Sequence, residues 1–83
     1  MSKNIIWTTQ YCPFCDKAKQ MMEDNKLEYE ARLVDDITWK LEDLLGYAPN
    51  ATTYPQIFLG DKHIGGCDDL QAHFALKEMS LGL

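Results

Sequence analysis

The sequence predicts an α/β domain that spans residues 1–83, with a four-stranded mixed sheet flanked by three helices. Its 83 residues, 46% of them hydrophobic, suffice for one core and are too few for a second. Strand-like and helix-like apolar patterns follow one another in the order strand, helix, strand, helix, hairpin, helix. A helix between the first two strands implies a right-handed crossover that makes them parallel, whereas the hairpin adds antiparallel pairs.

Two apolar patterns of different period define the first strand and the first helix. A strand is expected over residues 4–8, because a run of three β-favouring apolar residues begins at Ile5. A helix is expected to begin at Pro13 and stop at Asn25, because apolar side chains recur three and four positions apart on one face. The residues on that face are Phe14, Ala18, Met21 and Met22.

The second strand and the second helix are each predicted to have one solvent-facing side. Residues 28–34 alternate apolar and charged side chains, so the charged set, Arg32 among it, is expected to face solvent. A helix is expected over residues 38–45, with Trp39 in its apolar set. Gly46 follows directly, at the position where a left-handed residue commonly caps a helix.

The last third of the chain predicts a hairpin and a final helix. The apolar run 56–59 and the segment 62–64 are joined by Gly60-Asp61, a tight-turn signal. A helix is expected over residues 68–81, with one stripe of side chains at helical spacing. That stripe consists of Leu70, Phe74, Lys77 and Leu81.

Charge and cysteine content narrow the possible functions. The formal net charge of −5 at pH 7 makes general binding to nucleic acid or to anionic membranes unlikely, because both depend on excess Lys and Arg. The chain begins with too short an apolar run for a secretory signal, so a cytoplasmic location is expected. Three cysteines, an odd number, argue against a fully paired disulfide scaffold and favour redox chemistry or metal ligation.

The pair Cys12 and Cys15 at the predicted start of the first helix points to thiol chemistry. Pro13 suits the first helical position, which makes Cys12 the N-cap and directs the free amides of Phe14 and Cys15 at its sulfur. Such amides and the helix dipole bring a cysteine pKa into the range of roughly 3.5 to 7.5, so Cys12 is the predicted nucleophile. Cys15, one turn further on, is placed to resolve a mixed disulfide formed on Cys12.

A metal site is the alternative interpretation of the same pair. Cys67 would then supply a third ligand, and His63 or His73 a fourth. The sequence contains no second C-x-x-C motif, and the proline between the two cysteines stiffens the loop that would have to wrap the metal. We therefore expect no bound metal, and we expect both histidines to be surface residues without a catalytic role.

Three segments in the same order and spacing resemble the dithiol glutaredoxins over nearly the whole chain. They are Cys12-Pro13-Phe14-Cys15, Thr53-Tyr54-Pro55-Gln56-Ile57-Phe58 and His63-Ile64-Gly65-Gly66-Cys67-Asp68-Asp69-Leu70. The resemblance implies a thioredoxin fold and a glutathione-dependent thiol–disulfide oxidoreductase with catalytic Cys12 and Cys15. Glutathione would be a co-substrate, with no bound cofactor. The implied partners are glutathione and disulfide-containing or glutathionylated proteins, with ribonucleotide reductase as one candidate, and a monomer is expected.

The resemblance also implies a glutathione site around the two cysteines. A cis peptide before Pro55 would bring the backbone of Tyr54 beside Cys12, and the start of the last helix would bind the γ-glutamyl group. The implied glutathione-binding residues are Tyr11, Phe14, Thr53, Tyr54, Pro55, Gly66, Cys67, Asp68 and Asp69. For Asp68 and Asp69 simple helix capping is the alternative, and for Cys67 it is a half-buried thiol without catalytic duty.

The chain departs from the family pattern in the charges near Cys12. Thr9 stands where the family commonly has Lys or Arg, so one positive neighbour of the thiolate is absent. Lys19 is the predicted source of a pKa-lowering field, whereas Lys17 is expected to be solvated. Tyr54 stands where Val is commoner, and Phe14 where Tyr is commoner, which could reshape the floor of the groove.

Two further functions fit the same motif. The chain could be a homodimer that carries an iron–sulfur cluster through Cys12 and two glutathiones, which a brown colour in anaerobic preparations would reveal. Pro13 counts against this function. Alternatively, it could be a hydrogen donor that thioredoxin reductase reduces directly, which weak turnover with glutathione and good turnover with that reductase would reveal.

Overall fold

The computed structural model describes residues 3–81, with side chains described as far as residue 77. Its elements in chain order are β1 (Ile5–Thr8), α1 (Pro13–Asp24), β2 (Glu30–Leu33), α2 (Leu41–Tyr47), β3 (Gln56–Leu59), β4 (Lys62–Gly65) and α3 (Cys67–Leu81). The order of elements is the one predicted. None of the helices within the described range is long and apolar enough to cross a membrane.

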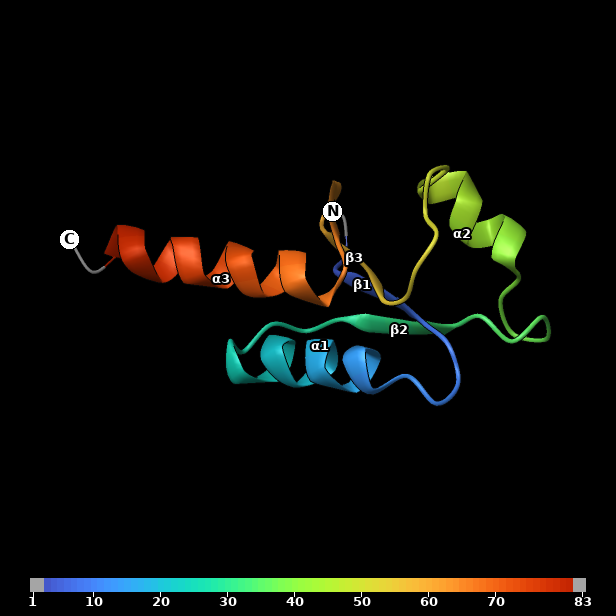
Figure 1. Cartoon of the computed structure of the whole chain (residues 1–83), viewed down its shortest axis with the longest axis horizontal. Helices are drawn as coiled ribbons and strands as arrows, with labels where there is room; N and C mark the ends of the chain where they lie inside the picture. The colour runs from blue at the N-terminus through green and yellow to red at the C-terminus, as the bar shows by residue number, and fades with distance from the viewer. Residues whose placement is uncertain (1–2, 82–83) are drawn as a thin grey trace.

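The four strands form one mixed sheet in the order β2-β1-β3-β4. β1 and β2 are parallel, and Ile5 is the Cα partner of Glu30 in that pair. β3 pairs antiparallel with β1, and Ile6 of β1 is the Cα partner of Ile57 of β3. β4 pairs antiparallel with β3. Because β1 and β2 run in the same direction, their carboxyl ends lie at the same edge of the sheet. The loops that follow both strands therefore emerge together (Figure 1).

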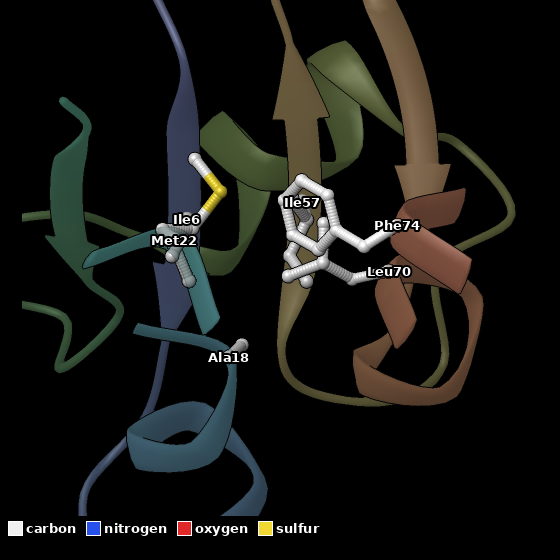
Figure 2. Packing of buried hydrophobic residues seen from close by; sticks show 6 residues of the cluster. All are labelled: Ile6, Ala18, Met22, Ile57, Leu70 and Phe74. Carbon is white, nitrogen blue, oxygen red and sulfur yellow. The ribbon is translucent and has the colours of Figure 1, made fainter. Parts of the chain in front are cut away.

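Each face of the sheet has its own buried cluster. On one face α1 and α3 pack against β1 and β3, and Figure 2 shows Leu70 and Phe74 of α3 lying over Ile57. The full cluster on this face is Ile6, Ala18, Met22, Ile57, Leu70 and Phe74. The cluster on the other face, beneath α2, is Trp7, Leu44, Ala48 and Phe58. This division follows from the alternation of side chains along β1, where Ile6 and Trp7 point to opposite faces.

The second helix is shorter and lies later than predicted. It begins at Leu41, because the Asp35 carboxylate accepts hydrogen bonds from the amides of Ile37 and Thr38, 2.9 and 2.7 Å away, and holds those residues in a turn. Lys40 is the N-cap, and Asp43 accepts a 2.9 Å hydrogen bond from its amide. The predicted capping role of Gly46 is wrong, since this glycine lies inside the helix and Ala48 is the C-cap.

The prediction of a solvent-facing charged side on the second strand is wrong for Arg32. Its side chain is only 13% exposed, and its guanidinium carbon lies 4.3 Å from the ring centre of Trp39 and 5.0 Å from that of Trp7. A guanidinium is weakly hydrated and stacks on aromatic faces, so these rings can cover it. Arg32 also pairs with Glu30. It thereby fixes Trp39, and with it the loop after β2, against the sheet.

Candidate active site

Cys12 lies at the N-terminus of α1, in the loop that follows β1. It is the N-cap residue, Pro13 is the first helical residue, and the Cys15 amide donates a 3.1 Å hydrogen bond to the Cys12 sulfur. The predicted second donor, the amide of Phe14, forms no such bond to this sulfur among residues 3–81. One backbone amide and the positive end of the helix dipole therefore face the sulfur.

Cys12 and Cys15 are joined by a disulfide in this structure, with their Cα atoms 5.2 Å apart. The two sulfurs have different surroundings, since Cys12 is half-buried whereas Cys15 is 1% exposed beneath the first turn of the helix. An attacking reagent can therefore approach the Cys12 sulfur, whereas Cys15 is shielded from solvent. This arrangement is the one expected of a nucleophile and a resolving thiol.

A cleft of about 360 Å³ lies beside the cysteine-bearing turn, and Phe14 of α1 forms one of its walls. Most of the residues predicted to bind glutathione line it: Phe14, Thr53, Tyr54, Pro55, Gly66, Cys67, Asp68 and Asp69. Gly65, which was expected with Gly66 to let the backbone pass close to the ligand, lines it too, as does Gln56, which had no predicted role. Tyr11 is not brought into the cleft, because its side chain is 99% exposed. A larger hollow of about 920 Å³, lined by residues 3–4 and 26–30, lies at the opposite end of β1 and β2.

The segment before β3 forms the second wall of the cleft. The predicted cis peptide bond between Tyr54 and Pro55 is confirmed. Gln56 is buried, and its side-chain amide donates hydrogen bonds to the backbone oxygen and the hydroxyl of Thr53, 2.9 and 3.3 Å away. The Gln56 amide oxygen lies 2.7 Å from Nε2 of His63, whose ring stacks on Phe58. Gln56 thus holds the Thr53 end of this wall in place, and His63 in turn holds the Gln56 side chain.

Gln56 was not predicted to belong to the site, although its place in the sequence carries a signal. A glutamine at the start of a buried strand must satisfy its amide within the protein, and the nearest polar groups are those of the preceding loop. His63 is exposed, as predicted, and its contact with the cleft wall is the hydrogen bond to Gln56.

The start of α3 closes the third side of the cleft. The helix begins at Cys67, one residue before the prediction, and Asp69 accepts a 3.0 Å hydrogen bond from the amide of Gly66. The capping alternative therefore describes what the Asp69 carboxylate does in this structure. Gly65 has a φ of +117°, and a Cβ atom added there would overlap the same carboxylate. Only glycine fits this position.

Cys67 is buried at the first helical position of α3. Burial raises the pKa of its thiol, Asp68 adds to the rise, and the positive charge of Lys17 partly offsets it. A thiol that stays protonated is a poor nucleophile, which agrees with a structural role for Cys67. Lys17 is exposed, as expected, yet its positive charge reaches Cys67 in the cleft wall, which was not predicted.

The charge in the cleft is negative. Among the described residues that line it, only Asp68 and Asp69 carry a charge. Lys19 lies half-buried in the second turn of α1, and its predicted effect on Cys12 stays a prediction. The alternative zinc site is not assembled within residues 3–81, because no three His, Cys, Asp or Glu side chains there gather closely enough to hold an ion.

Comparison with known proteins identifies the family. The glutaredoxin family model matches residues 4–64. A glutaredoxin of Pseudomonas aeruginosa is 38% identical over 68 residues, which cover 82% of this chain and 80% of that protein. The chain belongs to the glutaredoxin family. With its Cys12–Cys15 pair, this glutaredoxin is a thiol–disulfide oxidoreductase.

Solved glutaredoxins share the fold of this chain. The crystal structure of glutaredoxin 1 from Francisella tularensis, complexed with cacodylate, has a TM-score of 0.75 at 31% identity, covering 96% of this chain and 99% of that one. The crystal structure of a buckwheat glutaredoxin–glutathione complex has a TM-score of 0.74 at 26% identity, covering 92% of this chain and 72% of that one. The predicted thioredoxin fold is confirmed.

Proposed function

We propose that this glutaredoxin reduces glutathione mixed disulfides and protein disulfides, with the Cys12 thiolate as its nucleophile and glutathione as its reductant. The observation that carries the proposal is the Cys12 sulfur at the N-cap of α1, 3.1 Å from the Cys15 amide and beside a cleft. An amide and a helix dipole stabilise negative charge at the position where the attacking thiolate must form.

The proposed reaction on a mixed disulfide has two exchange steps. The Cys12 thiolate attacks the glutathionyl sulfur, so that a bond from Cys12 to glutathione forms, the substrate disulfide breaks and the substrate thiolate leaves. A second glutathione thiolate then attacks the glutathionyl sulfur, releases oxidised glutathione and regenerates the Cys12 thiolate. The net reaction converts the mixed disulfide and one glutathione thiol into one substrate thiol and oxidised glutathione.

A protein disulfide follows a different second step. Attack by Cys12 joins the enzyme to one substrate sulfur and releases the other as a thiolate. The Cys15 thiol then loses its proton and attacks the Cys12 sulfur, which forms the disulfide present in this structure and releases the reduced protein. Two glutathiones reduce that disulfide and leave as oxidised glutathione.

The walls of the cleft suggest how glutathione is held. The backbone of the Thr53–Pro55 segment offers strand-like hydrogen bonds to the tripeptide, and the first amides of α3 suit the γ-glutamyl carboxylate. Asp68 and Asp69 repel an anionic ligand, so backbone donors must provide the attraction, with Lys17 as a nearby cation. The related buckwheat glutaredoxin was solved as a glutathione complex, which supports this ligand.

The test is a glutathione-coupled reduction of a glutathione mixed disulfide by the parent, Cys12→Ser and Cys15→Ser. We expect no activity for Cys12→Ser and retained activity for Cys15→Ser on this substrate, because only the first thiol is needed. On a protein disulfide we expect Cys15→Ser to stall as a mixed disulfide. Equal activity of the parent and Cys12→Ser would disprove the proposal.

A further inference from the structure

Two apolar side chains at the active-site end of the molecule are exposed to solvent, one on a residue with a positive φ and the other directly after such a residue. Tyr11 is 99% exposed, and its φ is 54°. Ile37 is 88% exposed, and it follows Asp36, whose φ is 66°. Residues other than glycine rarely adopt these left-handed conformations. Strained residues that persist beside a reactive site indicate a role in binding or catalysis.

The loop that carries Ile37 is ordered by its own hydrogen bonds. The Asp35 carboxylate accepts from the amides of Ile37 and Thr38, 2.9 and 2.7 Å away. The amides of Asp35 and Asp36 donate to the backbone oxygen of Trp39, 3.2 and 3.0 Å away. Trp39 itself lies against the Arg32 guanidinium. The exposed isoleucine is therefore presented in a fixed place, which lowers the entropy lost when a partner binds it.

Both loops lie at the same end of the molecule as the cleft. They follow the parallel strands β1 and β2, and both lie at the carboxyl ends of those strands (Figure 1). Burial raises the pKa of Tyr54, and the negative charge of Asp36 adds to the rise, so this charge reaches the tyrosine. Tyr54 in turn lines the cleft. A protein that brings a disulfide to Cys12 comes next to Tyr11, its exposed neighbour in the chain, on the end of the molecule where the loop of Ile37 also lies.

The charges around these side chains favour a basic partner. Asp16 in the first turn of α1, Asp36 in the loop and Asp68 at the start of α3 are all exposed. Lys17 and Lys40 are exposed too, but the carboxylates outnumber them. The chain as a whole carries a formal charge of −5. Carboxylates beside an apolar contact attract Lys and Arg and repel Asp and Glu on the partner.

We propose that Tyr11 and Ile37 form a docking rim for protein disulfides that are flanked by an apolar residue and by Lys or Arg. This inference rests on the proposed function, since it names the substrates of the same site. Ile37 packs against the apolar residue, and Asp36 pairs with the basic one. A small mixed disulfide enters the cleft without touching Ile37.

The test compares substrates that differ only in the residues beside the disulfide. Two disulfide peptides of equal length carry Leu-Lys or Leu-Glu flanks, and the mixed disulfide of glutathione with 2-mercaptoethanol serves as the small substrate. We expect kcat/KM of the parent to be about tenfold higher for the Leu-Lys peptide, with the preference weakened by salt. Equal values for the two peptides would overturn the proposal.

Ile37→Asn separates the docking rim from the chemistry. We expect it to lower kcat/KM for the Leu-Lys peptide about fivefold, mainly by raising KM, because the variant loses the apolar contact that Ile37 makes with the bound peptide. Its turnover of the small substrate should equal that of the parent. Leu76→Asn is the matched control, since Leu76 is 64% exposed on α3, and it should leave all three substrates unaffected.

Asp36→Asn tests the charge separately and should reduce the preference for Lys over Glu flanks. The docking rim would be disproved if Ile37→Asn left kcat/KM for the Leu-Lys peptide unchanged, or if Leu76→Asn lowered it equally. Circular dichroism confirms that each variant is folded. If the parent fails on the small substrate, the proposed glutathione function fails. The docking rim can still be tested in that case, by comparing the Leu-Lys and Leu-Glu peptides with dithiothreitol in place of glutathione as the reductant.

Discussion

This glutaredoxin has two cysteines at two helix N-termini, and only one of them has the surroundings of a nucleophile. Cys12, the N-cap of α1, is half-buried and accepts a hydrogen bond from the Cys15 amide. Cys67, the first residue of α3, is buried and has a raised pKa, while Asp69 rather than the thiol accepts from the Gly66 amide. The comparison indicates that a helix start favours a reactive thiol where the sulfur accepts a backbone amide and remains in reach of solvent.

The largest expected difference is in the alkylation rates of the two thiols. In the reduced protein at pH 7, iodoacetamide should modify Cys12 at least about a hundredfold faster than Cys67, because a lowered pKa and exposure act together. Mass spectrometry of the digested protein at several times measures both rates. A Cys15→Ser background removes the second thiol of the pair. Comparable rates at Cys12 and Cys67 would show that the helix start does not distinguish them.

The backbone at the end of β4, just before α3, should be less tolerant of change than the backbone within α2. Gly65→Ala is expected to lower the free energy of unfolding by about 1–3 kcal/mol, because alanine is strained at φ +117° and its Cβ meets Asp69. Gly46→Ala is the control, since no atom lies within 4 Å of the added Cβ and the site is helical. It should raise the same free energy by about 0.5–1 kcal/mol. Urea unfolding of the reduced proteins measures both changes in free energy. Equal changes in the two variants would show that position 65 does not require glycine.

The buried thiol of Cys67 should make stability fall at alkaline pH. Its pKa is raised in the folded protein, so its stabilising contribution is complete below the unfolded value of about 8.5 and is lost as pH rises through the folded value. The parent should therefore lose more stability than Cys67→Ala between about pH 8.5 and 9.5, a window below the usual tyrosine range. Parallel curves of unfolding free energy against pH would show that ionising Cys67 does not affect folding.

The smallest expected effects are those of single charges near Cys12. Lys19→Gln should raise the pKa of the Cys12 thiol, and Thr9→Lys should lower it, each by less than about one unit because solvent screens these charges. The pH dependence of Cys12 alkylation measures both shifts. A shift of the wrong sign in Lys19→Gln would remove this lysine from the determinants of reactivity.

Most of the fold could be predicted because local patterns and topology agree. The apolar run of β1 and the periodic face of α1 depend on neighbouring residues, and the structure places both within a residue of the prediction. The second helix was predicted too early because the turn around Asp35 depends on side-chain hydrogen bonds that hydrophobic periodicity does not reveal. Arg32 was placed in solvent because strand alternation contains no information about the aromatic rings above the strand.

The sequence by itself determined the pair of cysteines at the head of a helix, because Cys12, Pro13 and Cys15 are neighbours whose geometry the helix start fixes. Only the tertiary structure decided that Gln56 and His63 support the cleft wall and that Lys17 acts on Cys67. It also decided that Ile37 comes to the end of the molecule that carries the active site. The physical reason is that such contacts join side chains far apart in the chain, and their distances depend on how the strands and helices pack.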